Sequence, residues 1–168
     1  AGRLGQNQGL SIGLNKLNVA MCGLNKNSYI VVGASNKVGK TVFCNTEFVI
    51  NVYLNNPDKN VKWVYYSYEM NREQMAFRFA SYFIYKDYGE KLSTNYLSGR
   101  AKSEDKKQII ISDKHLKYLE QVNTKYIIPL FGTYDDKDKL IEEGKILFFD
   151  KRDEPNNIKK FLEQLAGK

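Results

Sequence analysis

The chain has 168 residues, of which 42% are hydrophobic and 27% charged, a composition that can bury a core and excludes a disordered tail. No apolar run approaches the roughly 20 residues that cross a bilayer, and the polar first residues lack the apolar stretch of a secretory signal. The net charge of +7 favours a polyanionic partner, although lysines that only keep a small domain soluble explain it equally well. The two isolated cysteines, Cys22 and Cys44, predict small core residues in a reducing compartment.

The first third of the chain predicts an irregular segment, a strand and a helix. Residues 10–27 alternate short apolar groups with Gly and Asn and indicate an irregular lead-in. The β-branched and aromatic run at 29–32 ends at Gly33 and predicts a buried strand. Apolar residues at near-helical spacing over 39–54 predict a helix, which Asn-Asn-Pro-Asp ends at residues 55–58.

A second strand and a second helix follow. Residues 61–68 predict the strand, and Asn71 is suited to cap a helix that runs to about Tyr88. The apolar stripe of this helix is formed by Met75, Phe79, Tyr82 and Phe83. Strands that alternate with helices over short connections form the βαβ unit, so we predict an α/β fold with a mainly parallel sheet.

The rest of the chain is more polar. Residues 104–123 predict a helix inside a lysine-rich stretch, 91–125, whose positive charge indicates either a solvated face or contact with a nucleic-acid backbone. Residues 132–144 predict a hairpin-like insertion with a charged tip, and 146–149 a third core strand. Pro155 is suited to begin a last helix. The expected inward residues of that helix are Ile158, Phe161, Leu162 and Leu165.

The strongest chemical signal is the sequence GASNKVGKT at residues 33–41. It approaches the phosphate-loop pattern G-x-x-x-x-G-K-[ST], with Ala34 at the position of the first glycine. In a loop between a strand and a helix, backbone N–H groups point to the start of the helix, where the helix dipole favours an anion. Gly39 allows the backbone to approach a phosphate closely, Lys40 is placed to bridge β- and γ-phosphate oxygens, and Thr41 is placed to ligate Mg²⁺. A chance Gly-Lys-Thr at a strand-to-helix turn is the alternative.

The loop and both of its flanks resemble the DnaB-type replicative helicases. The loop resembles that family's loop, in which alanine also follows the first glycine, and residues 13–32 are similar to the family's lead-in. Downstream, the segment SYEMNREQMAFR is similar to a family segment and places Glu69, Met70, Glu73, Gln74 and Arg78 at its matching positions. The resemblance covers roughly residues 10–85.

This resemblance implies a RecA-like P-loop NTPase core, in which ATP hydrolysis with Mg²⁺ drives DNA unwinding. It implies a homohexameric ring that binds single-stranded DNA in the cytoplasm, or in the host cytoplasm if the chain is phage-encoded. The nucleotide-binding residues that it implies are Gly33, Ala34, Ser35, Asn36, Lys37, Val38, Gly39, Lys40, Thr41 and Cys44. Lys40 and Glu69 carry catalysis on this basis, since a glutamate at the end of the second strand activates the attacking water in the family. A glutamate that only complements the helix dipole is the alternative for Glu69.

Asp150 has two interpretations. It ends an apolar strand, which is the pattern of the aspartate that holds the Mg²⁺ shell. Residues 147–166 also resemble the family's intermediate strand and helix, in which case the metal-binding aspartate follows Lys168 and the domain is truncated. On that second interpretation the chain is one partial ATPase domain, with a lead-in at 1–28, a βαβα unit at 29–88, an insertion at 89–144 and a strand and helix at 145–168. Such a fragment should hydrolyse ATP poorly by itself.

Other functions fit parts of the sequence. A recombinase-like or other P-loop ATPase, a P-loop kinase, or a nucleotide-binding assembly module without turnover would also carry a phosphate loop. A kinase would normally have an arginine-rich lid, which the segment around Glu69 does not resemble. The single histidine, His115, has no cysteine or acid at metal-ligand spacing and is not expected to bind a metal or to act in catalysis.

Overall fold

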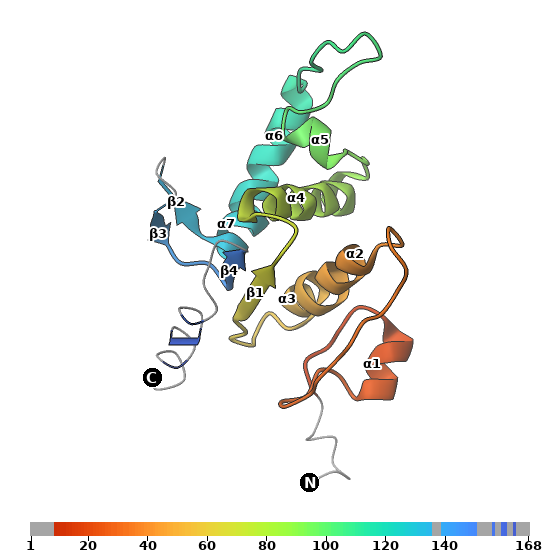
Figure 1. The fold of residues 1–168 in the computed structure, drawn as a ribbon, viewed down its shortest axis with the longest axis vertical. Helices are drawn as coiled ribbons and strands as arrows, with labels where there is room; N and C mark the ends of the chain where they lie inside the picture. The colour runs from red at the N-terminus through yellow and green to blue at the C-terminus, as the bar shows by residue number, and fades with distance from the viewer. Residues whose placement is uncertain (1–8, 136–138, 151–155, 157–158, 161–162, 164–168) are drawn as a thin grey trace. The chain divides into compact units, whose positions relative to one another are not determined.

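The computed structural model describes residues 9–135 and 139–150, together with residues 156, 159, 160 and 163. The chain divides into two compact units, Ala1–Val61 and Lys62–Lys168, whose elements are labelled in Figure 1. The described residues form no helix of the length and apolarity that a membrane span requires.

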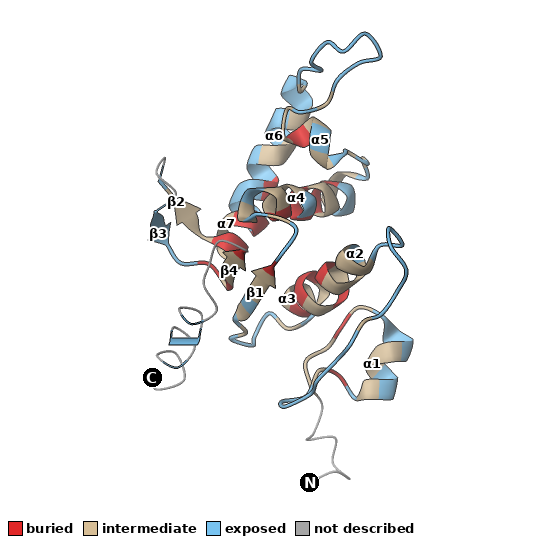
Figure 2. Ribbon diagram, viewed as in Figure 1, coloured by how far each residue is buried: buried red, intermediate tan, exposed pale blue. Residues whose placement is uncertain are grey.

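The first unit is built on one continuous helical segment. It consists of α2 (Lys40–Asn45), η2 (Thr46–Ile50), which is a π-helical turn, and α3 (Asn51–Asn55), so the helix predicted over 39–54 is confirmed. One side of the segment is buried (Figure 2), and Ile12 of the lead-in is buried as well. The buried side chains of the segment are Asn45, Glu47, Val49, Ile50 and Val52, whereas Val42 in the first turn is 59% exposed.

The lead-in is more ordered than the sequence predicts. It contains helix α1 (Asn15–Met21), and an antiparallel bridge joins Leu10 to Leu24. Cys22 caps α1 in the left-handed conformation with φ 54° and is exposed, so the prediction of a core cysteine is wrong at this position. Local polar groups, which carry no hydrophobic periodicity, hold this segment and are therefore missed by pattern analysis.

Polar side chains of the helical segment bind the lead-in backbone. The Asn56 side chain accepts a hydrogen bond from Ser11 N (3.0 Å) and donates one to Ser11 O (2.9 Å). Asn55 Nδ2 donates to Ile12 O at 3.3 Å, and the buried Glu47 carboxylate accepts from Leu14 N at 2.9 Å. These bonds satisfy backbone groups that would otherwise be unpaired against the helix.

The strand predicted at 29–32 is not formed. These residues have no strand assignment, and Tyr29 and Val31 are 92% and 75% exposed. A strand requires a neighbour for its backbone N–H and C=O groups, and no described residue pairs with this run. The residues of this run have the composition of a strand, but no strand among the described residues pairs with them.

The second unit contains a small parallel sheet, which confirms the α/β class. Strand β1 (Trp63–Ser67) pairs in parallel with β4 (Ile146–Asp150), in a register that sets Ser67 opposite Asp150. The strands predicted at 61–68 and 146–149 are therefore confirmed, with slightly different ends. The rings of Tyr65 and Phe148 stack across the pair with their centroids 5.4 Å apart.

Helix α4 (Arg72–Tyr88) begins where the sequence predicts. The Asn71 side chain accepts a hydrogen bond from Gln74 N, and the Gln74 side chain accepts one from Asn71 N, which is a complete capping box. The helix buries one face in the core of the second unit (Figure 2). The buried residues are Met75, Phe79, Ala80, Phe83 and Ile84.

The next helices differ from the prediction. After the short α5 (Thr94–Leu97), α6 spans Asp113–Val122, so the helix predicted over 104–123 begins nine residues late. The Ser112 side chain caps α6 by accepting a hydrogen bond from His115 N. Helical structure then continues through the π-helical η3 (Asn123–Ile127) and α7 (Ile128–Phe131).

The apolar run that follows α6 is helical because it packs against α4. The Tyr126 ring stacks on Phe83 with centroids 3.9 Å apart, and the Phe131 ring packs edge-on against Phe79. Pro129 lacks an N–H group and would break a regular helical ladder. The π-helical turn ends just before it, where Ile128 N donates to Asn123 O.

The insertion at 132–144 holds two short antiparallel strands, β2 (Thr133–Tyr134) and β3 (Leu140–Glu142). The inward residues expected for the last helix lie outside the described residues. Residues 156, 159, 160 and 163 are helical and exposed, and Lys159 lies 4.0 Å from Glu163.

Candidate functional site

The phosphate-loop sequence forms a sharply turned loop at the start of α2. Lys37 has φ 62° and Gly39 has φ 93° with ψ 22°, both in the left-handed region. The helix begins at Lys40, and Phe43 N donates its first intrahelical bond to Gly39 O at 2.9 Å. The N–H groups of the first turn have no carbonyl one turn earlier, so they face the loop without helical partners.

The Lys40 ammonium lies inside this loop. Its Nζ donates to Ala34 O at 2.7 Å and to Ser35 O at 3.3 Å. Residues 33–39 are exposed, which leaves the loop open to a ligand from solvent. The arrangement therefore combines a positive charge, unpaired N–H groups and an accessible loop, which are the features that bind a phosphate anion.

Thr41 and Cys44 follow on α2 and are half-buried. Burial raises the pKa of the Cys44 thiol, so this side chain is uncharged at neutral pH. The described residues form no cluster of three or more His, Cys, Asp or Glu side chains that could hold a metal. Mg²⁺ often binds through one or two protein oxygens plus substrate phosphates, and the Thr41 hydroxyl next to an anion-binding loop fits that mode.

Glu69 and Asp150 line a second site, in the Lys62–Lys168 unit. The carboxyl ends of β1 and β4 open into a cavity of about 330 Å³. Its walls are Ser67, Tyr68, Glu69, Met70, Asn71, Gln74 and Asp150. Asp150 is only 6% exposed and Ser67 7%, whereas Glu69 is exposed. The Ser67 hydroxyl accepts a hydrogen bond from Met70 N at 3.0 Å, which shapes the turn that carries Glu69.

The predicted site residues are thus divided between the units. The phosphate loop, Thr41 and Cys44 belong to Ala1–Val61, and Glu69 belongs to Lys62–Lys168 together with Asp150. Three residues of the cavity of about 330 Å³ were not expected there from the sequence, namely Ser67, Asn71 and Gln74. The signal for the last two was present, since Asn71 and Gln74 have the spacing of a capping box directly after Glu69.

His115 belongs to a polar cluster of the Lys62–Lys168 unit and does not line the cavity of Glu69 and Asp150. Its Nε2 lies 2.8 Å from Glu90 Oε2, and its Nδ1 lies 2.9 Å from the Tyr96 hydroxyl. Hydrogen bonds from Lys114 and His115 lower the pKa of the Glu90 carboxyl. Because these contacts connect the end of α4 to α5 and α6, the cluster holds the helices together.

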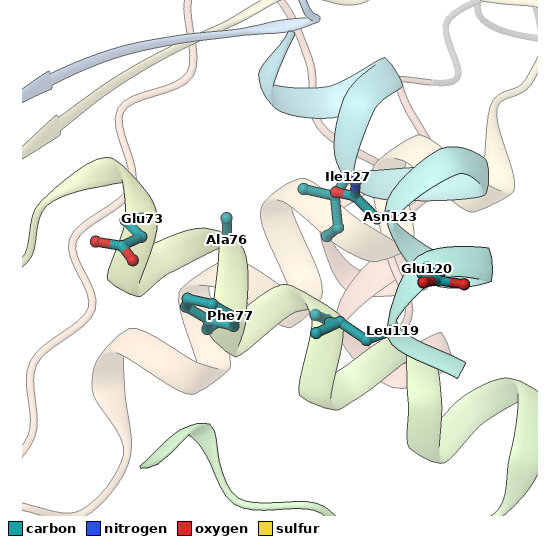
Figure 3. Close-up of a pocket in the computed structure, with 8 residues that line it drawn as sticks. Glu73, Ala76, Phe77, Leu119, Glu120, Asn123 and Ile127 are labelled. Carbon is teal, nitrogen blue, oxygen red and sulfur yellow. The ribbon is translucent and has the colours of Figure 1, made fainter. Parts of the chain in front are cut away.

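A groove of about 350 Å³ separates α4 from α6 and η3 (Figure 3). Its lining is Glu73, Ala76, Phe77, Ala80, Leu119, Glu120, Asn123 and Ile127, which is mostly apolar. Figure 3 shows Glu73 at the start of α4 and Phe77 one turn later. The groove offers no basic side chain for a phosphate.

A family model described as DnaB-like helicase C terminal domain matches residues 9–126, which is most of the chain. The chain belongs to the DnaB-like helicase C-terminal domain family. This confirms the resemblance drawn from the phosphate loop and from the segment around Glu69, both of which lie inside the match. Domains of the DnaB-like family are helicase motors with a RecA-like fold.

The match to the DnaB-like family ends before β4, so both interpretations of Asp150 stay predictions. A comparison with curated proteins and one with solved structures found no match.

Proposed function

We propose that this chain is the ATP-binding part of a DnaB-like replicative helicase motor, which couples ATP hydrolysis to DNA unwinding in the full-length protein. One observation carries the proposal. The phosphate-loop sequence lies inside the family match and folds into an exposed loop that encloses the Lys40 ammonium at the start of a helix.

The phosphate loop supplies binding. Gly39 turns the backbone so that the first N–H groups of α2 face the loop, and the Lys40 ammonium can exchange its two carbonyl partners for phosphate oxygens. Charge-assisted hydrogen bonds of this kind are about twice as strong as neutral ones. Thr41 would hold Mg²⁺ together with the nucleotide, and the ion would neutralise charge on the transferred phosphoryl group.

Glu69 supplies the group that orients and deprotonates the attacking water. It is exposed at the carboxyl end of β1, where a parallel α/β sheet places its ligand-facing residues. Asp150 shares the cavity with Glu69, and two carboxylates at one sheet edge suit a site that handles water and Mg²⁺. In this proposal Glu69 accepts the proton of the attacking water, and Asp150 keeps the two interpretations given above, as the aspartate of the Mg²⁺ shell or as the end of an intermediate strand.

The proposed partners are single-stranded DNA and further copies of the chain in a hexameric ring, and the proposed location is the cytoplasm, or the host cytoplasm if the chain is phage-encoded. The family match supports these proposals, and the net charge of +7 favours a polyanion such as DNA.

The test is DNA-stimulated ATP hydrolysis by the full-length protein. We expect single-stranded DNA to raise the rate, and Lys40→Ala to abolish both nucleotide binding and turnover while the circular dichroism spectrum stays unchanged. Lys26→Ala, which removes an exposed lysine outside the loop, is the matched control and should keep both activities. Phosphate transfer to a small acceptor would instead indicate a kinase, and tight binding without turnover a nucleotide-binding assembly module.

A further inference from the structure

A smaller cavity, of about 230 Å³, is also lined by Glu69. Its other lining residues come from the start of α4, from α5 and from the turn that follows α5. Its lining is Glu69, Met70, Glu73, Gln74, Phe77, Arg78, Thr94, Asn95, Ser98 and Arg100. Glu69, Met70 and Gln74 also line the cavity that contains Asp150, so the two cavities share a wall. All of these residues belong to one unit of the chain.

Two arginines from different elements line this cavity. Arg78 lies on α4, and Arg100 follows α5 in a turn where the backbone N–H groups of Arg100 and Ala101 both donate to Asn95 O, at 2.7 and 3.0 Å. Neither guanidinium forms an ion pair with a described residue. Guanidinium groups bind phosphate oxygens in bidentate geometry, so two of them on one cavity indicate a phosphate-bearing ligand.

The other lining groups indicate more than a phosphate. Two carboxylates, Glu69 and Glu73, line the cavity together with the two guanidinium groups. Glu73 precedes Arg78 by five residues on α4, about 7.5 Å along the helix axis at the usual rise per residue. Phe77 and the polar side chains of Thr94, Asn95 and Ser98 belong to the same lining. Carboxylates accept hydrogen bonds from sugar hydroxyl or base amino groups, and an aromatic ring packs against a base.

We propose that this cavity binds one nucleotide unit, free or within a single strand, with its phosphate on Arg78 and Arg100. The sugar hydroxyl or base amino groups donate to Glu69 and Glu73, and Phe77 contacts the base. The cavity belongs to the Lys62–Lys168 unit and the phosphate loop to Ala1–Val61, and this proposal requires no nucleotide on the phosphate loop. Because Glu69 lines both cavities, an occupant would restrict the conformation of the residue that is proposed to activate water.

The test uses the 168-residue chain with Lys40→Ala, which silences the phosphate loop. The ¹⁵N-labelled protein is titrated with the oligonucleotide dT8, with AMP and with inorganic phosphate, and the side-chain amide signals of Gln74 and Asn95 are followed by NMR. We expect saturable shifts of both signals. Arg78→Gln and Arg100→Gln should each weaken binding at least about tenfold, as loss of a charge-assisted contact does. Lys102→Gln removes the same charge from the same loop outside the cavity and should change the affinity little.

Shifts with dT8 alone would assign the site to a strand, and shifts with AMP to a free nucleotide; either supports the proposal. Equal weakening by Lys102→Gln and Arg100→Gln would overturn it, because the binding would then be a general effect of charge. Equal affinity for inorganic phosphate and AMP would overturn the roles of Glu69 and Glu73. Unchanged amide signals with every probe would overturn the site itself and would leave the proposed role of the phosphate loop as it stands.

Discussion

Gly39 is the residue at which backbone conformation matters most for the phosphate loop. Its φ of 93° lies in the region that favours glycine, and a Cβ added there would meet no atom within 4 Å. Gly39→Ala should therefore cost about 1–3 kcal/mol of backbone strain without any clash. We expect weaker nucleotide binding and a lower melting temperature, measured by calorimetry.

Gly33→Ala is the matched control for that change. Gly33 also has open space around it, but its φ is outside the left-handed region. This variant should keep both the stability and the affinity. Equal losses in the two variants would show that the loop needs small residues and that strain at Gly39 is not the cause.

Glu69 should govern the rate of hydrolysis and leave binding unchanged. A carboxylate that takes a proton from water stabilises the transition state far more than the bound nucleotide, and such groups contribute about 10²–10⁴-fold. In the full-length protein, Glu69→Gln should lower kcat by that factor with little change in nucleotide affinity.

Glu104→Gln, in an exposed loop, is the control for Glu69→Gln and should keep the parental rate. A parental rate in Glu69→Gln itself would reduce Glu69 to a residue that complements the dipole of α4. Parallel losses of affinity and rate would make it structural.

At the scale of the element, the capping box of α4 is a local device with a measurable contribution. Asn71→Ala removes the acceptor for Gln74 N and should lower the free energy of unfolding by about 1 kcal/mol. Urea unfolding measures the change. Asn71→Ser keeps an acceptor at the cap and should retain most of the stability; equal destabilisation by both variants would contradict the capping role.

The elements that could be predicted from the sequence are those with local causes. The start of α4 was predictable because Asn71 and Gln74 lie three residues apart and complete each other's hydrogen bonds. The run at 29–32 was predicted as a strand from its composition, but a strand also depends on a partner that the pattern does not contain. The start of α6 was predicted too early. The lysine-rich residues before it have a composition typical of helices, whereas one hydrogen bond to the Ser112 side chain fixes where the helix begins.

The candidate site shows the same division. The loop at the start of α2 could be located from the sequence because its motif is contiguous, and its binding of phosphate stays a prediction. The two arginines of the 230 Å³ cavity were not predicted to line one site. Arg78 and Arg100 are separated by α5, and only the turn after α5 brings them to one cavity.

At the scale of the molecule, acid should loosen the second unit. Burial would raise the pKa of Asp87, but hydrogen bonds from Lys125 and Tyr126 outweigh it and lower the pKa. The pKa of Glu90 is lowered as well. A carboxyl whose folded pKa lies below its unfolded value stabilises the fold above the unfolded pKa, and this stability is lost as pH falls through the folded pKa. We expect the loss below about pH 4.

Urea unfolding at pH 7, 5 and 3 measures this effect. Asp87→Asn should reduce the difference in unfolding free energy between pH 5 and pH 3, because it removes one of the groups that titrate. Asp105→Asn, in an exposed loop, should leave the difference unchanged. An unaltered difference in Asp87→Asn would contradict the assignment.

The division of the chain predicts that residues 62–168 fold independently of 1–61. The parallel pair β1–β4 and the core of α4 are made within that unit. The isolated fragment should keep the helical circular dichroism signal and a cooperative thermal transition. A broad transition without near-ultraviolet signal would contradict this prediction.

The bonds between the lead-in and α3 have a mechanical consequence. Asn55 and Asn56, at one end of the helical segment, form hydrogen bonds with the backbone of Ser11 and Ile12. Lys40 begins the segment at its other end, about 22 Å from Asn55 at the usual helical rise. A pull on the chain ahead of Gly9 would therefore be transmitted through the Asn56 side chain to the residues that follow it. Residues 13–54, which include the phosphate loop, lie between the bonded positions, so the hydrogen bonds would carry this load in place of the loop.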